Sequence, residues 1–266
     1  MSKYETLLIE KRDHIGTITL NRPERLNAFD ATMRAEFPQA MVEMENDAKV
    51  RVVVVTGAGD AYSAGADIHG FADRLTTRGE PAQQSRDGEA ALGRMPVFMR
   101  NMSKAVIAAI NGVCVGMGLT LSLCADIRLA SDNARMGALF ARMGITPEYG
   151  STYNLSRIVG IAKACELVLT ARIIDAAEAL EIGLVNHVYP AAEFKQATLE
   201  MATSIAKLPP FAIRLAKRGL YQGLDTNLEA QLDWEMFALE AALHSADHAE
   251  AVKAFLEKRE PRFGPQ

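Results

Sequence analysis

The stretch "VRVVVVTGAG", residues 50–59, restricts the possible folds of this chain more than any other. Its apolar residues are β-branched and continuous and they end at glycines, which is typical of a strand buried on both faces of a sheet. The stretches "SKAVIAAING" (103–112) and "CADIRLAS" (124–131) have the same character. Strands of this kind belong to parallel sheets covered by helices, so the pattern predicts an α/β fold.

The first part of the chain predicts a hairpin followed by a helix. "YETLLIEK" and "HIGTITL", between residues 4 and 20, are two short strand patterns joined by a polar turn. Residues 30–47 have apolar side chains at helical spacing, and Asp30 is a residue type that caps helices. Pro38 lies inside this pattern, so we expect it to kink or split the helix.

The later segments alternate between strand and helix signals. "GVCVGMGLTLSL", residues 112–123, indicates a glycine turn that opens a short helix. From about residue 151 onward helical patterns dominate, and residues 171–189 interrupt them with a strand, a helix and a strand. Together these patterns predict an α/β core with a helical C-terminal part.

Composition argues against several partners. The chain has 266 residues, a net charge of -4 and an isoelectric point near 5.8, so it has no basic surface for nucleic acid or for an anionic membrane. Its three cysteines form no C-x-x-C pair, and an odd number favours reduced thiols in a cytosol-like compartment. Charged residues interrupt the first twenty positions before any signal peptide or membrane span forms. We therefore expect a cytoplasmic protein.

Several familiar motifs fail in detail. "GAGDAY" begins like a dinucleotide fingerprint, but Tyr62 stands where the third glycine is required. His244 and His248 have the spacing of two metal ligands on one helix face, yet no third ligand is evident, so we interpret them as surface residues and expect no metal. The chain has neither a G-x-S-x-G nucleophile elbow nor a phosphate-binding G-x-x-x-x-G-K-[ST] loop.

Two glycine-containing stretches remain, "AYSAGADIHGF" (61–71) and "INGVCVGMGLTLSLCADI" (110–127). Each places a turn after an apolar strand and before a predicted helix, where backbone amides have no intrahelical acceptor. Two such amides that face one another would form an oxyanion hole. The alternative is that the glycines only permit tight turns or close packing of strand against helix.

These stretches, taken in order with others, resemble the crotonase superfamily of enoyl-CoA hydratases and isomerases. The resemblance also includes "NRPERLNAF" (21–29), "MGITPEYGSTYNLSRIVG" (143–160) and the tail "FLEKREPRF" (255–263), so it covers nearly the whole chain. It implies an α/β spiral of repeated ββα units over residues 1–200 and a helical C-terminal region over residues 201–266 that serves oligomerisation. It further implies a homotrimer or a dimer of trimers.

The resemblance implies that the ligand is an acyl-CoA thioester, with coenzyme A as part of the substrate and no permanently bound cofactor. The backbone amides of Ala66 and Met117 occupy the positions that hold the thioester oxygen and stabilise an enolate. Met117 departs from the glycine usual there, so its side chain is expected to narrow the pocket or to form part of its wall. The coenzyme would contact Arg25 and the backbone around Ala64, Asp67 and Ile68, with Phe255 and Lys258 supplied by an adjacent subunit. Arg25 and Lys258 are equally explained as solvated surface charges.

The two glutamates of typical family hydratases are absent. Their positions hold Thr120 and Phe140 in this chain. A threonine hydroxyl is a poor base and a phenylalanine supplies no proton, which argues against plain hydration.

Glu148 supplies a different carboxylate. It stands in "PEYG", where one branch of Δ3,Δ2-enoyl-CoA isomerases carries its only base. A single carboxylate suffices for allylic isomerisation, because the group that removes the C2 proton can return it at C4. The alternative is that Glu148 caps the helix that starts near Gly150.

Three classes of function stay open: an isomerase that uses Glu148, another crotonase reaction, and a non-catalytic acyl-CoA-binding protein. The second class includes hydration, C–C cleavage and thioester hydrolysis, assisted by Thr120, His69, Asp73 or Glu89. Side chains between Gly70 and Met99 are candidates for the acyl pocket or for the core: Phe71, Leu75, Leu92 and Phe98.

Overall fold

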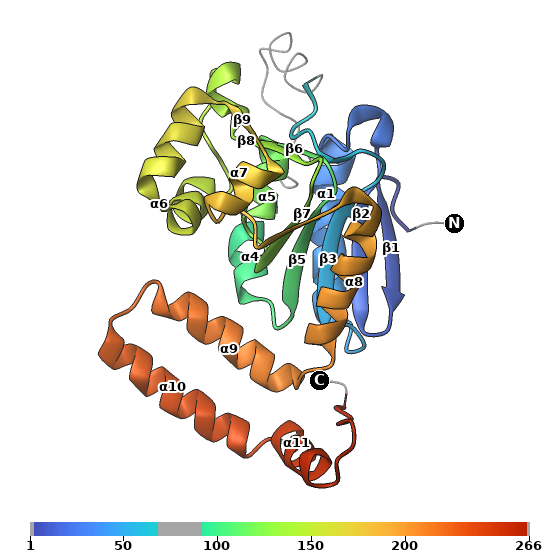
Figure 1. The fold of residues 1–266 in the computed structure, drawn as a ribbon, viewed down its shortest axis with the longest axis vertical. Coiled ribbons are helices and arrows are strands. Elements are labelled where there is room, and N and C mark those ends of the chain that lie inside the picture. The colour runs from blue at the N-terminus through green and yellow to red at the C-terminus, as the bar shows by residue number, and fades with distance from the viewer. Residues whose placement is uncertain (1–2, 69–91, 265–266) are drawn as a thin grey trace.

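The computed structural model describes residues 3–68 and 92–264 and contains two β-sheets surrounded by helices (Figure 1). The larger sheet has six strands in the order β1-β2-β3-β5-β7-β10. They are β1 (Leu7–Arg12), β2 (Ile15–Leu20), β3 (Val52–Gly57), β5 (Ala105–Ile110), β7 (Ile127–Ser131) and β10 (His187–Tyr189). The smaller sheet has four strands in the order β4-β6-β8-β9. They are β4 (Ala61–Ser63), β6 (Val113–Val115), β8 (Arg135–Gly137) and β9 (Ile173–Asp175).

The chain passes repeatedly from the larger sheet to the smaller one. β3 leads to β4, β5 to β6 and β7 to β8, and a helical segment follows each pair. These segments are α4 (Met95–Asn101), α5 (Met117–Ser122), and the 3-10 helix η2 (Leu139–Met143) with α6 (Ser151–Thr170). This path is the spiral of ββα units that the resemblance implied. The sequence itself shows no repeat, because the units share a backbone path and not a residue pattern.

The valine run of β3 is buried on both faces, as predicted. Val53 and Val55 belong to the main core, which includes apolar residues of α1 (Ala31–Asn46). Val52 and Val54 belong to a second core with side chains of α8 (Ala191–Ala206). β2, β3, β5 and β7 pair in parallel, so one helix layer covers each face of the central strands.

The hairpin and the first helix form as expected, but Pro38 does not split the helix. β1 pairs with β2 in antiparallel register, and the Asp30 side chain accepts a hydrogen bond from the Met33 amide at the start of α1. The helix continues from Ala31 to Asn46 with Pro38 inside it. Proline removes one backbone hydrogen bond at a cost of about 3 kcal/mol. Burial of the helix face on the sheet offsets that cost, since each buried side chain stabilises by roughly 1.5–3 kcal/mol. The buried residues of that face are Met33, Phe37, Pro38, Ala40, Met41 and Met44.

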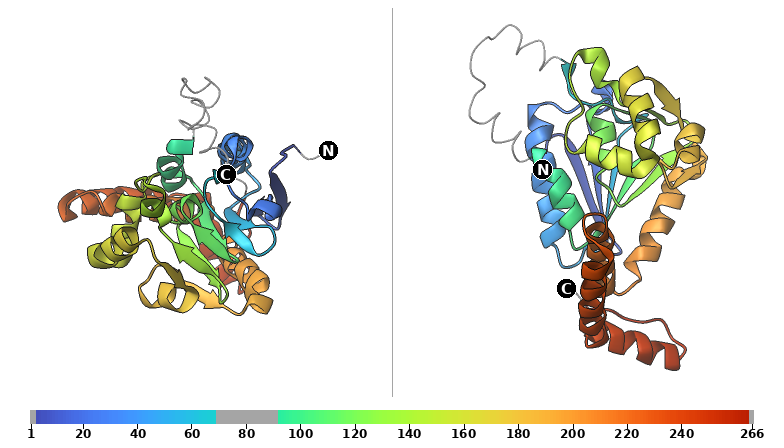
Figure 2. Two further views of the ribbon diagram at one scale, coloured as in Figure 1. Left: turned by 90° about the horizontal axis from the view of Figure 1, so that it is seen from above. Right: turned by 90° about the vertical axis from the view of Figure 1, so that its left-hand side faces the viewer.

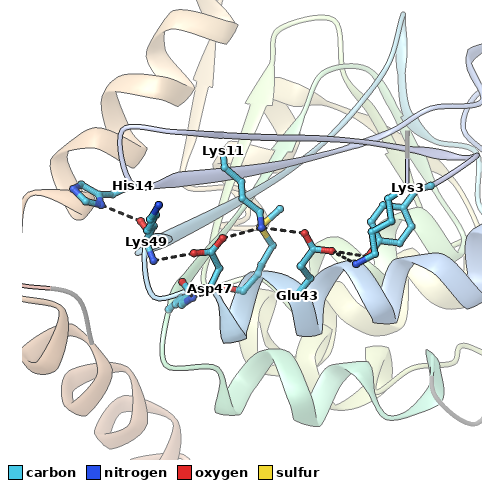
Figure 3. Close-up of polar contacts among 9 residues, drawn as sticks. Lys3, Lys11, His14, Glu43, Asp47 and Lys49 are labelled. Atoms are coloured by element: carbon cyan, nitrogen blue, oxygen red, sulfur yellow. Dashed lines mark hydrogen bonds and ion pairs between the residues drawn. The ribbon is translucent and has the colours of Figure 1, made fainter. Parts of the chain in front are cut away.

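A row of charges fastens the edge strand β1 to α1 (Figure 3). The Lys11 ammonium lies 3.0 Å from a Glu43 oxygen and 2.8 Å from an Asp47 oxygen, one helical turn apart. Lys3 contacts the other Glu43 oxygen at 2.5 Å. Hydrogen bonds from Lys3 and Lys11 lower the pKa of Glu43 from its ordinary 4.5 to about 2. The charges also discourage other strands from pairing with β1.

The last helices gather at one end of the molecule, away from β4 and β6 (Figures 1 and 2). They are α9 (Pro210–Gly223), α10 (Leu228–Leu243) and α11 (Ala246–Leu256). The remaining short helix, α7 (Ala176–Glu181), lies between β9 and β10 in the chain. Lys217 of α9 is buried, with its ammonium 2.8 Å from an Asp126 oxygen, and it donates to the carbonyls of Met99 and Lys104. Those contacts dock α9 on the core.

α10 has no buried residue. His244 and His248 are both exposed, as the sequence interpretation expected. They do not share a helix, because His244 follows α10 whereas His248 lies in α11. Within the described parts of the chain, no helix is both long and apolar enough to span a membrane.

Candidate active site

The two glycine stretches meet at one edge of the smaller sheet. β4 and β6 pair in parallel, with Ala61 opposite Val113 and Ser63 opposite Cys114. Parallel neighbours end at the same edge, so the loop after Ser63 and the turn at Gly116 lie side by side. A Cβ atom added to Gly118 would lie 2.5 Å from the Ser63 carbonyl oxygen, so α5 packs directly against β4.

The backbone amides of Ala66 and Met117 are both open there. Ala66 forms a parallel bridge with Phe29, in which the Phe29 amide donates to the Gly65 carbonyl and the Asp67 amide donates to the Phe29 carbonyl. The bridge therefore uses the Gly65 carbonyl and the Asp67 amide, which flank the Ala66 amide, and not the Ala66 amide itself. Met117 is the first residue of α5, where an amide has no intrahelical acceptor. Neither amide has an acceptor among the residues that the structure describes.

The Met117 side chain is directed into the protein. The residue is 1% exposed and belongs to the main hydrophobic core. Gly116, with φ of 53°, forms the turn before it. The side chain thus packs inside while the amide remains available, so a glycine is not required at position 117.

Glu148 lies between η2 and α6 and is half-buried. Within residues 3–68 and 92–264, its carboxylate makes no hydrogen bond and no ion pair. The Glu148 side chain forms no capping hydrogen bond with α6, because the helix begins after Gly150 and has no side-chain cap. The following residues turn sharply, with φ of 49° at Tyr149 and 70° at Gly150.

The loop of Glu148 contacts the helix that begins at Met117. The Cys124 thiol, just past the end of α5, lies 3.9 Å from the Tyr149 carbonyl oxygen and donates to the Thr120 carbonyl at 3.3 Å. The Tyr149 ring packs against the main core. The backbone of the Glu148 loop therefore lies beside the residues that follow α5, the helix that presents one of the open amides.

Burial raises the pKa of Glu148 above its ordinary 4.5, and the positive charge of Arg34 on α1 partly offsets that rise. Arg34 also donates through Nε to the Phe29 carbonyl at 3.4 Å. The guanidinium is thus close to both the Phe29–Ala66 bridge and the Glu148 loop. A half-buried carboxyl with a raised pKa is better suited to accept and return a proton than a fully solvated one.

Thr120 and Phe140 are enclosed in the core. Thr120 is 1% exposed, and its hydroxyl donates to the Met117 carbonyl at 3.0 Å. Phe140 is 4% exposed and packs in the main core. Neither side chain offers a titratable group in the place of a glutamate.

The residues assigned to coenzyme A are only partly brought together. Ala64 donates its amide to the Leu26 carbonyl, and the Asp67 carboxylate pairs with Arg22, so both have partners within the protein. Ile68 is 58% exposed, and Arg25 is exposed in the 3-10 helix η1 (Pro23–Arg25).

Phe255 and Lys258 lie at the opposite end of the molecule. Phe255 belongs to α11 and is 83% exposed, and Lys258 follows that helix with φ of 53°. Figures 1 and 2 show α11 far from β4 and β6. Neither residue reaches the candidate site of its own chain, so both still depend on the predicted adjacent subunit.

Several candidates lie outside the described residues: His69, Phe71, Asp73, Leu75 and Glu89. Of the acyl-pocket candidates that are described, Leu92 is fully buried and Phe98 packs against the main core. The structure thus gives these two a core position. The described parts of the chain hold no cluster of three or more His, Cys, Asp or Glu side chains that could bind a metal ion.

Sequence analysis did not single out Arg22, which connects the Ala66 loop to α1. The guanidinium bonds Asp67, which is 45 residues away in the chain. Two residues so far apart in the sequence form no recognisable spacing pattern. The only available signal was the arginine of "NRPERLNAF", a stretch that the family resemblance already included.

Comparisons with known proteins all point to one family. The family model for enoyl-CoA hydratase/isomerase matches residues 10–266. A short-chain-enoyl-CoA hydratase of Clostridium acetobutylicum is 36% identical over 256 residues, which cover 95% of each chain. A 1,2-epoxyphenylacetyl-CoA isomerase of Escherichia coli is 34% identical over 263 residues, covering 97% of this chain and 98% of that one. The crystal structure of an enoyl-CoA hydratase from Bacillus anthracis superposes with a TM-score of 0.89 at 34% identity, covering 97% and 99% of the two chains.

Proposed function

This chain belongs to the enoyl-CoA hydratase/isomerase family, and from that premise we propose that it converts a 3-enoyl-CoA to the 2-enoyl-CoA with Glu148 as its only acid–base group. The observation that carries the proposal is the Glu148 carboxyl, which makes no hydrogen bond and no ion pair within the described parts of the chain and has a pKa raised by burial. It lies in a loop whose Tyr149 carbonyl is 3.9 Å from the Cys124 thiol, just past the end of the helix that begins with Met117.

The proposed reaction needs two functions from the protein. The amides of Ala66 and Met117 donate hydrogen bonds to the thioester oxygen and stabilise the negative charge that develops there, and one such donor is typically worth about 10²–10³ in rate. Glu148 removes a proton from C2 to form the dienolate and returns it at C4, which moves the double bond into conjugation. The carboxyl is regenerated at the end of the cycle, so no second acid is required.

Hydration is the second candidate, and the names of the Clostridium relative and of the Bacillus structure favour it. Hydration requires a base to activate water at C3 and an acid to protonate C2. The two positions that the family resemblance assigns to those groups hold buried Thr120 and buried Phe140. Glu148 alone would have to do both tasks, so we rank isomerisation first.

The test is the Glu148→Gln variant assayed with 3-enoyl-CoA and with 2-enoyl-CoA substrates. Glutamine keeps the size of the side chain but accepts no proton, so isomerisation should fall by about 10²–10⁴ while acyl-CoA affinity stays nearly unchanged. Glu181→Gln, at an exposed position on α7, is the matched control. Rapid hydration of 2-enoyl-CoA that survives in Glu148→Gln and disappears in Thr120→Ala contradicts the assignment. Tight binding without turnover favours a non-catalytic acyl-CoA-binding protein or a more specialised reaction.

The proposed assembly is a homotrimer or a dimer of trimers. α10 exposes a set of large apolar side chains that no described part of the same chain covers, and such surfaces mark contacts between proteins. They are Leu228 (75% exposed), Leu232 (51%), Met236 (66%), Phe237 (65%), Leu239 (54%) and Leu243 (47%). An adjacent subunit that covers this helix would also bring Phe255 and Lys258 toward a neighbouring coenzyme site.

A further inference from the structure

The loop that presents the Ala66 amide is held by side chains as well as by backbone. In the loop that follows β4, hydrogen bonds to Phe29 fix the backbone on both sides of Ala66. The Phe29 amide donates to the Gly65 carbonyl at 2.7 Å, and the Asp67 amide donates to the Phe29 carbonyl at 3.0 Å. The direction of the Ala66 amide therefore depends on where Phe29 and Asp67 are placed. Phe29 ends the segment that begins at Arg22, and Asp67 pairs with Arg22 itself.

Arg22 contacts three parts of this arrangement at once. Its Nη1 and Nη2 atoms both lie 3.1 Å from one oxygen of Asp67. Nε lies 3.3 Å from the Asp30 carboxylate, which caps α1, and Nη1 donates to the Ala28 carbonyl at 2.6 Å. The side chains of Arg22 and Asp67 are only 17% and 12% exposed, so solvent screens the pair weakly.

The buried side-chain amide of Asn27 adds further hydrogen bonds between the same two segments. Asn27 is fully buried, accepts a hydrogen bond from the Arg22 amide and donates to the carbonyls of Ala58 and Ala61. The Ser63 hydroxyl donates to the Asn27 carbonyl and accepts from the Gly65 amide. Residues 22–29 and residues 58–67 are therefore one hydrogen-bonded unit, with the Ala66 amide at its edge.

On the premise of the function proposed above, we propose that Arg22, acting through Asp67, is a positioning residue that aims the Ala66 amide at the thioester oxygen. Ion pairs with little exposure contribute little net stability compared with apolar side chains, but they fix direction, because a guanidinium offers its donors in a rigid plane. A displacement of about 1 Å at a catalytic group can cost on the order of 10² in rate. Asp67 is the residue next to Ala66, so a shift of the Arg22–Asp67 pair would displace the Ala66 amide directly.

The variants are Arg22→Lys, Arg22→Met, Asp67→Asn and the double variant Arg22→Met/Asp67→Asn. Each should lower kcat roughly 10- to 100-fold with KM nearly unchanged. The double variant should lose no more than the worse single variant, because both remove the same contact. Arg22→Lys keeps the charge but loses the planar fork, so it should resemble Arg22→Met more than wild type.

The matched control is a second arginine–carboxylate pair away from the loop. Arg172 donates through Nη1 to Glu178 at 2.7 Å, and the two side chains are 32% and 29% exposed. Arg172→Met and Glu178→Gln should leave kcat at the wild-type value. If kcat falls as much in the control variants as in Asp67→Asn, then the effect comes from losing any ion pair of this kind. It would not come from a changed position of the Ala66 amide.

The decisive readout is the infrared band of a thioester carbonyl, measured with a ¹³C-labelled saturated acyl-CoA that does not react. Donors at the oxygen lower the frequency of this band, so bound wild type should show a downshift and the Arg22 and Asp67 variants a smaller one. A downshift that is equal in wild type and in the folded variants overturns the role of Arg22 and leaves the oxyanion hole intact. No downshift in wild type refutes the assignment of the Ala66 and Met117 amides, and with it the role of Arg22.

Discussion

Gly65 faces Met117 across the two loops of the candidate site, with too little room between them for a side chain at Gly65. A Cβ atom on Gly65 would be 3.2 Å from the Met117 amide nitrogen and 2.9 Å from the Val115 carbonyl oxygen. Gly65 also has φ of 94°, which side-chain-bearing residues rarely adopt. Glycine is therefore required here both by backbone conformation and by the approach of the loop to α5.

The first prediction concerns Gly65→Ala. The added carbon forces the Ala66 loop and the start of α5 apart, so the two amides no longer converge and kcat should fall by about 10² or more. Gly183→Ala is the matched control, because Gly183 has φ of 75° but its nearest contact would be 3.9 Å away. Both variants carry backbone strain, and only Gly65→Ala should lose activity in steady-state assays of the folded protein. Equal activities in the two variants would show that the loops do not need this contact.

The second prediction concerns the pH dependence of turnover. Burial raises the pKa of Glu148 above 4.5, and the charge of Arg34 lowers it. Glu148 must be ionised to accept the C2 proton, so kcat/KM should fall as pH decreases through this pKa. Removal of the positive charge in Arg34→Met favours the neutral carboxyl, so the acidic limb of the profile should move to higher pH. Arg157→Met, at an exposed position on α6, should leave the limb in place.

Local patterns predicted the elements that local physics determines. The valine run formed β3, the Asp30 cap started α1, and the glycine turn before Met117 opened α5. The expectation that Pro38 could split the helix was wrong, because its effect depends on tertiary burial of the helix, which no short stretch of sequence shows. Glu148 was found from the family resemblance, and its freedom from a capping role became evident only once α6 was seen to start after Gly150.

Long-range pairs had no equivalent signal. The Arg22 to Asp67 contact joins residues 45 positions apart, and Lys217 reaches the Met99 carbonyl across 118 positions. Each residue alone is an ordinary charged side chain, and its partner is determined by the order of strands in the sheets. The convergence of the Ala66 and Met117 loops likewise depends on the parallel pairing of β4 with β6.

The third prediction concerns the buried contact between α9 and the core. Lys217→Met leaves the Asp126 carboxylate, whose side chain is 16% exposed, without its counter-charge. Loss of one partner of such a pair costs about 3–5 kcal/mol, so the unfolding midpoint in urea should fall clearly. Asp126 still accepts from the Val106 amide and from the Tyr221 hydroxyl, which places the loss near the lower value. Lys217→Met/Asp126→Asn should recover part of the stability, and a double variant less stable than Lys217→Met contradicts the interpretation.

The fourth prediction concerns acid stability at the β1 edge. The folded-state pKa of Glu43 is about 2, below the ordinary 4.5, so ionised Glu43 stabilises the fold above pH 4.5 and this contribution is lost as pH falls toward 2. Because the pair is near the surface, we expect Glu43→Gln to cost no more than about 1 kcal/mol at pH 7. The difference between wild type and variant should shrink as pH falls through this window. Glu10→Gln, at an exposed position of β1, should show no such convergence.

The last prediction joins α10 to the coenzyme site. Leu232 and Met236 are one helical turn apart on α10 and are 51% and 66% exposed, so charges at both positions should prevent an adjacent subunit from covering the helix. Leu232→Asp/Met236→Asp should yield a smaller species in light scattering. If Lys258 completes a neighbour's site, this variant should also bind coenzyme A esters more weakly, and Lys258→Ala should weaken binding in the intact oligomer without changing its size. The matched control is Lys253→Ala on α11, which removes a charge from the same helical region. A wild-type monomer with full affinity would contradict both the assembly and the shared site.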